Sequence, residues 1–381
     1  MSGTVDRRFA RELFARYPGT MSLPWVELAS LPTRVERAPA LSSAAGAEVW
    51  VKRDDLSAVF YGGNKVRKLE FALGDALAKG ATDVITFGAA GSNHALATAI
   101  YGRQLGLRVH SMLLPQPNAH YVRRNLVASL SAGADLHHFA DGAHAMRGAA
   151  RLRRALRDRT GHEPYVIPFG GTTPLSTAGL VNAGLELGTQ VEYHELPEPD
   201  LVYIALGSAG TAAGIALGMR AAGLRSRVVA VSVLPAEVAG THSLLDAIRS
   251  AQEVLRAAEP AFPARTWSPA DVDVAEGFLG EEYARFTPEG MAAVRVAATD
   301  GVHLEGTYTG KTAAALLAHG RAGKLEGKRV LLWDTYNSRD AAELLAIDAV
   351  ALRRVPYRLR RYFDEDVQPL DAEPEVEEPR A

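Results

Sequence analysis

The chain has 381 residues, of which 47% are apolar and 23% charged, and its formal net charge is −2. This composition predicts a globular protein with a sizeable core, and the near-neutral charge gives no sign of nucleic-acid binding. The absence of cysteine excludes disulfides, thiolate catalysis, zinc ribbons and iron–sulfur clusters, and it fits a reducing compartment.

No apolar run approaches the ~20 residues that a membrane span needs. The N-terminal residues 1–19 are basic but lack the apolar segment of a secretory signal. We therefore expect a cytoplasmic protein with neither a membrane nor a nucleic-acid partner.

Short apolar runs alternate with helical stretches along most of the chain, which predicts an α/β fold with mostly parallel sheets. The helical stretches include residues 94–105, 143–159, 211–222 and 338–347. The expected strands are residues 49–53, 83–87, 108–114, 165–169, 200–206, 227–234 and 329–335.

The first chemical motif is a lysine behind two glycines, in the sequence YGGNKVRKLE from Tyr61. Asn64 is predicted to cap a helix, which places Lys65 in the first helical turn. A cation is unfavourable there because it opposes the helix dipole. Lys65 is either an ordinary surface lysine or a Schiff-base lysine with an activated amine.

A second motif, GSNHALA, joins the strand at 83–87 to a helix. Ser92 and Asn93 follow the carboxyl end of a parallel strand, where α/β sheets bind ligands, and helix N–H groups there can accept an anion. Simple helix capping by either residue is the alternative, and His94 alone is more typical of a structural histidine.

The third motif, GSAGTAAG, lies between the strand at 200–206 and a helix, with its turn at residues 207–211. Backbone amides at such a helix start bind phosphate. No GK[ST] follows, and the dinucleotide pattern GxGxxG fails, which disfavours a nucleotide-dependent dehydrogenase. The loop indicates a small phosphorylated cofactor, with tight strand–helix packing as the alternative.

Two further motifs end the globular part of the sequence. Tyr308 precedes Gly310 and a helix in YTGK, and Asp334, Thr335 and Asn337 lie at the end of the last expected strand. A tyrosine near a lysine is a candidate acid–base group, although either element alone is usually a packed loop.

The C-terminal residues change in character. Residues 353–363 carry five arginines, and residues 364–381 hold eight acidic residues against one arginine. This composition predicts a solvated tail that is disordered at its end, with contact to the basic segment or to a partner as the alternative.

Taken together and in this order, GGNKVRKLE, GSNHALA, GSAGTAAG and YTGK resemble the 1-aminocyclopropane-1-carboxylate deaminase and D-cysteine desulfhydrase family. The resemblance covers residues 48–340 and implies pyridoxal 5'-phosphate as cofactor and fold type II, the tryptophan-synthase-β-like fold. It implies two three-layer αβα domains and a homodimer. The expected division is a large cofactor-binding domain of residues 1–81 and 176–350, a small inserted domain of residues 82–175, and a C-terminal tail of residues 351–381.

The resemblance also implies roles for individual residues, with no metal among them. Lys65 forms the Schiff base with the cofactor and moves the α-proton, and Ser92 and Tyr308 complete the catalytic group. Ser92, Asn93, His94 and Tyr308 bind the substrate. The remaining cofactor contacts are assigned to Asn64, Asn93, Gly207, Ser208, Ala209, Gly210, Thr211 and Thr335.

The sequence departs from the family pattern at several places, two of which bear on the predicted activity and pocket. Thr309 replaces a glutamate of the deaminases that act on the cyclopropane ring, which favours a desulfhydrase-like enzyme. Asp334-Thr335-Tyr336-Asn337 replaces a family HTGG, so Tyr336 and Asn337 stand where the resemblance implies glycines beside the cofactor. A remodelled pocket is expected.

The predicted function is a pyridoxal-phosphate-dependent lyase or deaminase acting on a small amino acid. α-Proton abstraction and β-elimination would yield a 2-oxo acid and ammonia. The alternatives are a 1-aminocyclopropane-1-carboxylate deaminase, an amino-acid racemase, a β-replacement enzyme, or a non-catalytic homologue that binds the cofactor or an amino acid.

Overall fold

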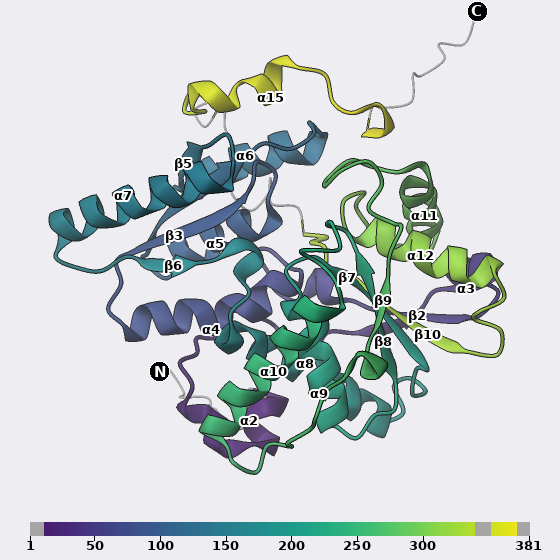
Figure 1. Ribbon diagram of the computed structural model, residues 1–381. Coiled ribbons are helices and arrows are strands. Elements are labelled where there is room, and N and C mark those ends of the chain that lie inside the picture. The colour runs from purple at the N-terminus through teal and green to yellow at the C-terminus, as the bar shows by residue number, and fades with distance from the viewer. Residues whose placement is uncertain (1–10, 340–351, 372–381) are drawn as a thin grey trace, which may run out of the picture.

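The computed structural model describes residues 11–339 and 352–371, and it contains two sheets that lie side by side (Figure 1). The six-stranded sheet has the order β1-β2-β10-β7-β8-β9, and the four-stranded sheet has the order β5-β4-β3-β6. Every described strand pair is parallel except β1 with β2. The predicted α/β class with mostly parallel sheets is confirmed. The strands are β1 Val35–Arg37, β2 Glu48–Lys52, β3 Asp83–Ala89, β4 Arg108–Leu114, β5 Asp135–His138, β6 Tyr165–Ile167, β7 Leu201–Leu206, β8 Arg227–Ser232, β9 Asp273–Ala275 and β10 Arg329–Trp333.

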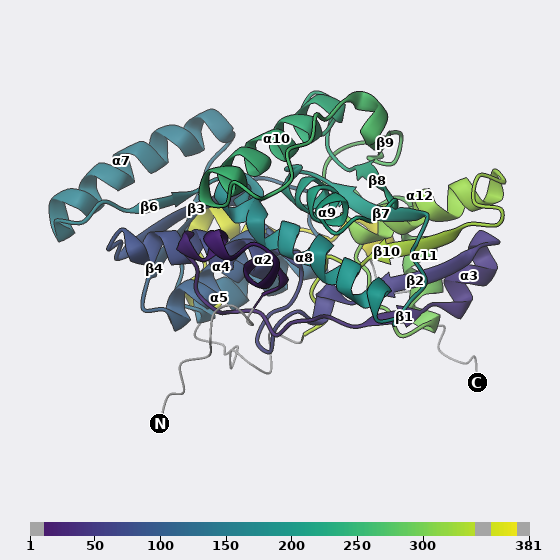
Figure 2. The same cartoon turned by 90° about the horizontal axis from the view of Figure 1, so that it is seen from below.

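Helices surround both sheets (Figures 1 and 2). They are α2 Glu12–Arg16, α3 Pro39–Ala45, α4 Asn64–Ala78, α5 Asn93–Gln104, α6 His120–Ser131, α7 Gly142–Thr160, α8 Pro174–Glu192, α9 Gly210–Ala221, α10 Thr241–Ala258, α11 Pro288–Thr299, α12 Thr309–Arg321 and α15 Arg361–Asp364.

The six-stranded sheet is buried on both faces. On β7, Val202 and Ile204 pack with α8, α9 and α10, whereas Tyr203 between them packs with α3, α11 and α12. Successive side chains of a strand point to opposite faces, so a continuous apolar run supplies two cores at once.

The four-stranded sheet follows the same rule. Val84 of β3 belongs to a core with α4, α5 and α6, whereas the next residue, Ile85, packs with α7 on the opposite face. This sheet is built only from residues 83–167, and the larger sheet is built from residues before and after them. The domain limits at 81/82 and 175/176 remain predictions.

All seven predicted strands are present, with ends within two residues of those expected. β6 ends at Ile167 because Pro168 has no N–H to continue the ladder. The predicted helices at 94–105, 143–159 and 211–222 are α5, α7 and α9. The helix expected at 338–347 lies almost wholly outside the described residues.

The C-terminal segment packs against the small sheet's helices as far as the structure describes it. Val355, Leu359 and Tyr362 are buried in the core that contains α6. The end of the predicted acidic tail, residues 372–381, lies outside the described residues. Within residues 11–339 and 352–371, no helix combines the length and apolar character that crossing a membrane requires.

Candidate active site

A cavity of about 320 Å³ lies where the carboxyl ends of β3 and β7 meet. Ser92, Asn93 and His94 line it from the small-sheet side, and the turn after β7 lines it from the large-sheet side. Its volume is within the range of small-molecule sites, and its place is the one where parallel sheets bind ligands. Of the residues that were assigned a catalytic, substrate-binding or cofactor-binding role, Gly210 alone is not in the cavity wall.

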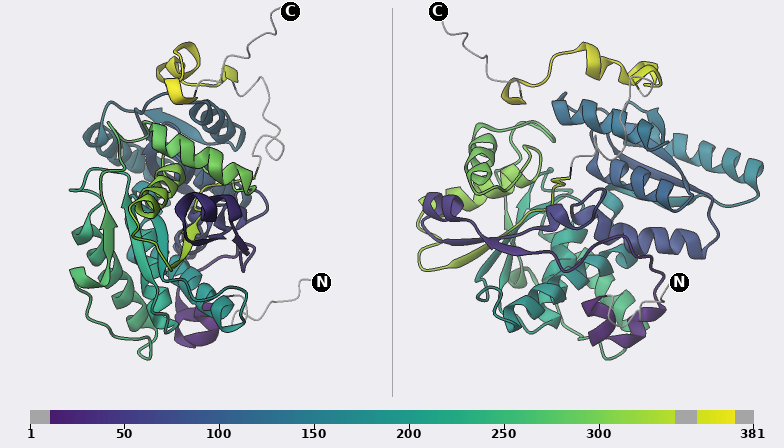
Figure 3. Two further views of the ribbon diagram at one scale, coloured as in Figure 1. Left: turned by 90° about the vertical axis from the view of Figure 1, so that its right-hand side faces the viewer. Right: turned by 180° about the vertical axis from the view of Figure 1, so that it is seen from behind.

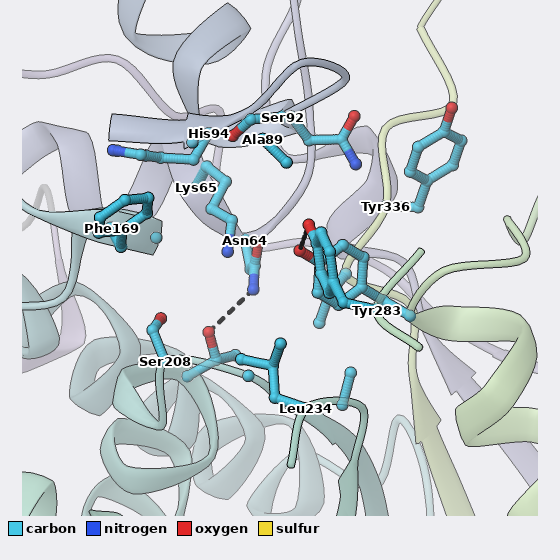
Figure 4. Close-up of a pocket in the computed structure, with 18 of the residues that line it drawn as sticks. Asn64, Lys65, Ala89, Ser92, His94, Phe169, Ser208, Leu234, Tyr283 and Tyr336 are labelled. Carbon is cyan, nitrogen blue, oxygen red and sulfur yellow. Dashed lines mark hydrogen bonds between the residues drawn. The ribbon is translucent and has the colours of Figure 1, made fainter. Parts of the chain in front are cut away.

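Lys65 is the second residue of α4 and reaches into this cavity (Figure 4). The loop before it is tightly held. Gly63 has φ +89°, and a Cβ there would lie 2.7 Å from the Tyr336 carbonyl oxygen. The Gly62 N–H donates to Asn337 Oδ1 over 2.6 Å. These contacts fix the start of α4, and with it the direction of Lys65.

The prediction that Asn64 caps α4 is wrong, because Gly63 occupies the cap position and Asn64 is the first helical residue. The Asn64 amide instead donates to Thr211 Oγ1 over 2.8 Å. This bond joins the lysine loop to the turn after β7, two segments that are far apart in sequence.

The Lys65 amine is placed for nucleophilic chemistry. Burial lowers its pKa to about 8, and the opposite charge of Glu305 acts against that effect. In the part of the chain that the structure describes, the amine has no hydrogen-bond or ion-pair partner. A neutral, unengaged amine is the form that attacks an aldehyde.

The start of α5 supplies polar groups to the same cavity. Ser92 caps the helix, because its Oγ accepts the Ala95 N–H over 3.2 Å, and its own hydroxyl proton stays available. Asn93 Oδ1 accepts hydrogen bonds from the Tyr61 hydroxyl at 3.2 Å and from Asn125 Nδ2 at 2.9 Å. Asn93 is therefore held rigidly, with its amide orientation set by two donors.

His94 contacts Thr86 Oγ1 through Nε2 at 3.0 Å, and its buried Nδ1 has no partner among the described residues. Burial, with the charges of Lys65 and Lys68, holds its pKa well below the usual range. The ring is therefore neutral at physiological pH, and His94 lines the cavity as an uncharged group.

The turn after β7 is shaped as an anion site. It leads into α9, where the Gly210 N–H donates to the Ser208 carbonyl oxygen over 2.8 Å and the next N–H groups of the first turn have no intrahelical partner. Ala209 takes the left-handed value φ +62°. A Cβ on Gly210 would lie 2.7 Å from Thr172 Oγ1, so the turn is close-packed against a neighbouring loop.

Lys68 lies behind this turn, and sequence reasoning missed it. Burial holds the pKa of its amine well below the usual range. Its buried amine donates to Thr172 Oγ1 over 2.8 Å and to the Gly170 carbonyl oxygen over 3.1 Å. Thr172 Oγ1 in turn contacts Ser208 Oγ at 2.8 Å. The signal was present in GGNKVRKLE, because Lys68 lies one helical turn after Lys65.

Tyr308 lies on the opposite wall and is paired with Tyr283, another residue that the sequence did not indicate. Their hydroxyl oxygens are 2.5 Å apart. Glu305 accepts the backbone N–H groups of Thr307, Tyr308 and Thr309 at 2.6 to 3.0 Å, and burial raises its pKa above the usual range. Glu305 thus fixes the start of α12 and the position of Tyr308.

The segment after β10 corrects one expectation. Thr335 and Tyr336 line the cavity, and Arg124 donates to the Tyr336 hydroxyl over 2.6 Å. Asn337 does not line the cavity, because its side chain binds Gly62 and Arg339. Asp334 is buried behind the site, where burial and the neighbouring Asp55 raise its pKa well above the usual range.

These residues fit pyridoxal phosphate. The Lys65 amine would meet an aldehyde, and the start of α9 with Ser208 and Thr211 would offer donors to a phosphate. Thr335 would offer a hydroxyl to a ring nitrogen. No described group of histidine, cysteine, aspartate and glutamate side chains could hold a metal ion.

Comparisons with known proteins agree with this fit. Residues 26–335 match the family described as pyridoxal-phosphate dependent enzyme. The chain is 38% identical to nocardicin C-9' epimerase of Nocardia uniformis subsp. tsuyamanensis over 85% of this chain and 95% of the relative. It is 34% identical to D-cysteine desulfhydrase of Klebsiella pneumoniae over 77% of this chain and 88% of the relative. A crystal structure of an ACC deaminase homologue is similar with a TM-score of 0.73 and 32% identity, over 88% of this chain and 99% of the other.

Proposed function

Because this chain belongs to the family of pyridoxal-phosphate-dependent enzymes, in the branch of 1-aminocyclopropane-1-carboxylate deaminases and D-cysteine desulfhydrases, we propose that it converts a small amino acid into a 2-oxo acid and ammonia. The observation that carries the proposal is the meeting of the unengaged Lys65 amine, the α9 anion site and the Tyr308 hydroxyl in one cavity. For a cysteine-type substrate, water is consumed and hydrogen sulfide leaves with the ammonia.

The cofactor, when bound, withdraws electrons from the substrate α-carbon and so makes its proton acidic. Lys65 is proposed to hold the cofactor and then to accept this proton, since a pKa of about 8 suits a base at neutral pH. Ser92 and the N–H groups at the start of α5 are proposed to bind the substrate carboxylate. Thr335 is proposed to contact the ring nitrogen, where a hydroxyl does not enforce protonation.

Thr309 supports β-elimination over opening of a cyclopropane ring. Its side chain is buried and accepts the Glu305 N–H over 2.9 Å, so it adds neither a charge nor an acid to the cavity. The hydroxyl of Tyr308, the residue before α12, is then proposed to face the substrate and to deliver a proton to the leaving group or to orient the substrate.

An epimerase or racemase is the second candidate, because the relative with 38% identity is named as an epimerase. The hydroxyl-bearing residues Ser92 and Tyr308 line the cavity together with Lys65. Either hydroxyl could return a proton to the α-carbon. Product analysis separates the two candidates, since epimerisation releases neither ammonia nor a 2-oxo acid.

The test is a panel of D- and L-amino acids that includes D-cysteine and 1-aminocyclopropane-1-carboxylate, scored for 2-oxo acid, ammonia and chirality. We expect equal amounts of 2-oxo acid and ammonia from at least one D-amino acid. Lys65→Ala should lower kcat by about 10²–10⁴-fold, the usual contribution of a positioned acid–base group. Borohydride reduction followed by peptide mapping should label Lys65. Labelling of another lysine, or stereoinversion without ammonia, would reject the lyase.

We further propose that the enzyme acts in the cytoplasm as a homodimer with a small amino acid as its substrate. The lack of cysteine supports a reducing compartment, and the dimer rests on the family. Light scattering of the holoenzyme should give about twice the chain mass of 40.7 kDa, and a mass of a single chain would exclude the dimer.

A further inference from the structure

The C-terminal segment of residues 352–371 lies beyond residues 26–335, which match the family, and it joins the two halves of the molecule. Figure 3 shows it running across the α6 side of the molecule toward the side of α11 and α12. The first part is anchored by apolar burial. Val355, Leu359 and Tyr362 belong to the core around α6.

Polar contacts extend this anchor along the segment. Asn118 Nδ2 donates to the carbonyl oxygens of Tyr362 and Glu365 at 2.9 and 2.8 Å. Arg123 Nε donates to the Tyr362 carbonyl oxygen over 2.7 Å. The segment is therefore attached to the small-sheet side of the cavity through residues 118–123.

Gln368 connects that side to the other wall. Its N–H donates to the Asn118 carbonyl oxygen over 2.9 Å. Its side chain, which is 5% exposed, accepts the Phe286 N–H at 2.7 Å and donates to the Ala284 carbonyl oxygen at 3.1 Å. One residue thus satisfies backbone groups on both sides of the site.

The loop that Gln368 holds is strained and carries a residue of the cavity wall. Ala284 has φ +63°, a left-handed value that is costly for a residue with a Cβ. Such a conformation persists only when surrounding contacts hold it. The residue directly before it is Tyr283, whose hydroxyl lies 2.5 Å from that of Tyr308.

We propose that Gln368 is a positioning residue that holds Tyr283 against Tyr308 on the substrate side of the cavity. Residues 352–371, here called the strap, bring Gln368 to the loop that carries Tyr283. The strap reaches the site from outside the family-matched residues. It acts through the backbone of residues 284–286 rather than by touching the substrate.

The test compares Gln368→Met, which keeps the length of the side chain but removes both hydrogen bonds, with Asp366→Asn. Asp366 is exposed on the same segment, and its backbone contact to Asn118 is retained in the control. Hydrogen exchange of the holoenzyme reads the Phe286 amide directly. Gln368→Met should raise its exchange roughly tenfold or more, and Asp366→Asn should leave it unchanged.

A double-mutant cycle with Tyr283→Phe tests the connection to the site. The KM measurement rests on the proposed function, whereas the hydrogen-exchange measurement at Phe286 does not. Gln368→Met should raise KM for the amino acid roughly tenfold, with cofactor content unchanged. The double variant should show less than the product of the two single effects, because both act on one hydroxyl. Unchanged exchange at Phe286, or effects that multiply, would overturn the proposal.

Discussion

At the scale of single residues, the amine of Lys65 makes a prediction about pH. Burial lowers its pKa to about 8 from the ordinary 10.5, so the neutral amine is present at far lower pH than for a solvated lysine. The rate at which the cofactor-free protein captures pyridoxal phosphate should rise with pH up to about 8 and then level. At pH 7 the neutral fraction exceeds that of an ordinary lysine by about two orders of magnitude.

Stopped-flow absorbance of the bound cofactor measures this rate. Lys65→Ala provides the control, because it keeps the anion site but removes the amine. In this variant the absorbance change that accompanies capture of the cofactor aldehyde by the amine should be absent. A rate that keeps rising toward pH 10 would show that the amine titrates as a solvated lysine and would contradict the prediction.

At the scale of elements, we expect alanine to destabilise the protein more at Gly63 than at Gly80, two glycines with positive φ near the ends of α4. Gly63→Ala would place a Cβ 2.7 Å from the Tyr336 carbonyl oxygen, whereas Gly80→Ala, at the other end of α4, meets nothing within 4 Å. Gly63→Ala should lower the free energy of unfolding by about 3 kcal/mol, from strain and overpacking together. Gly80→Ala should cost about 1 kcal/mol from strain alone.

Denaturant unfolding of the cofactor-free variants measures both values. Gly63→Ala should also reduce cofactor content, since its clash lies next to Lys65, and Gly80→Ala should not. Equal losses of stability would show that the loop before α4 relaxes, and that the Gly63 contact does not set the direction of the lysine.

The elements also show which parts of the fold the sequence could predict. Long apolar runs such as β4 and β7 were found because burial on both faces demands them. The three missed strands, β1, β5 and β9, have three or four residues each and lie at sheet edges, where one side needs no partner and polar residues are tolerated.

The site residues that were predicted differ from those that were missed in whether a local sequence pattern marks them. Ser92 and Ser208 lie in strand-to-helix turns, and Lys65 and Tyr308 lie at the starts of α4 and α12. Both kinds of position have a sequence signature. Tyr283 lies in a stretch without regular structure. Its hydroxyl contacts that of Tyr308, 25 residues away, and the residues that follow it, Ala284 and Phe286, bond Gln368, more than 80 residues away. No local pattern carries that information.

At the scale of the whole molecule, the site depends on both sheets at once, so a ligand that fills it should stabilise the entire fold. Asn64 bonds Thr211, and residues 92–94 face the turn at 207–211 across the cavity. A ligand that binds only the folded protein adds about 2.7 kcal/mol to the free energy of unfolding at 100 times its Kd. Removing pyridoxal phosphate should therefore lower both the unfolding free energy and the Tm.

Inorganic phosphate should restore a part of the loss, because it fills the anion site at α9 without reaching Lys65. In Lys65→Ala, pyridoxal phosphate and inorganic phosphate should stabilise to a similar extent, since the covalent link is gone. Calorimetry of the four combinations checks this, and equal stabilisation of both proteins by pyridoxal phosphate would mean that Lys65 contributes nothing to its retention.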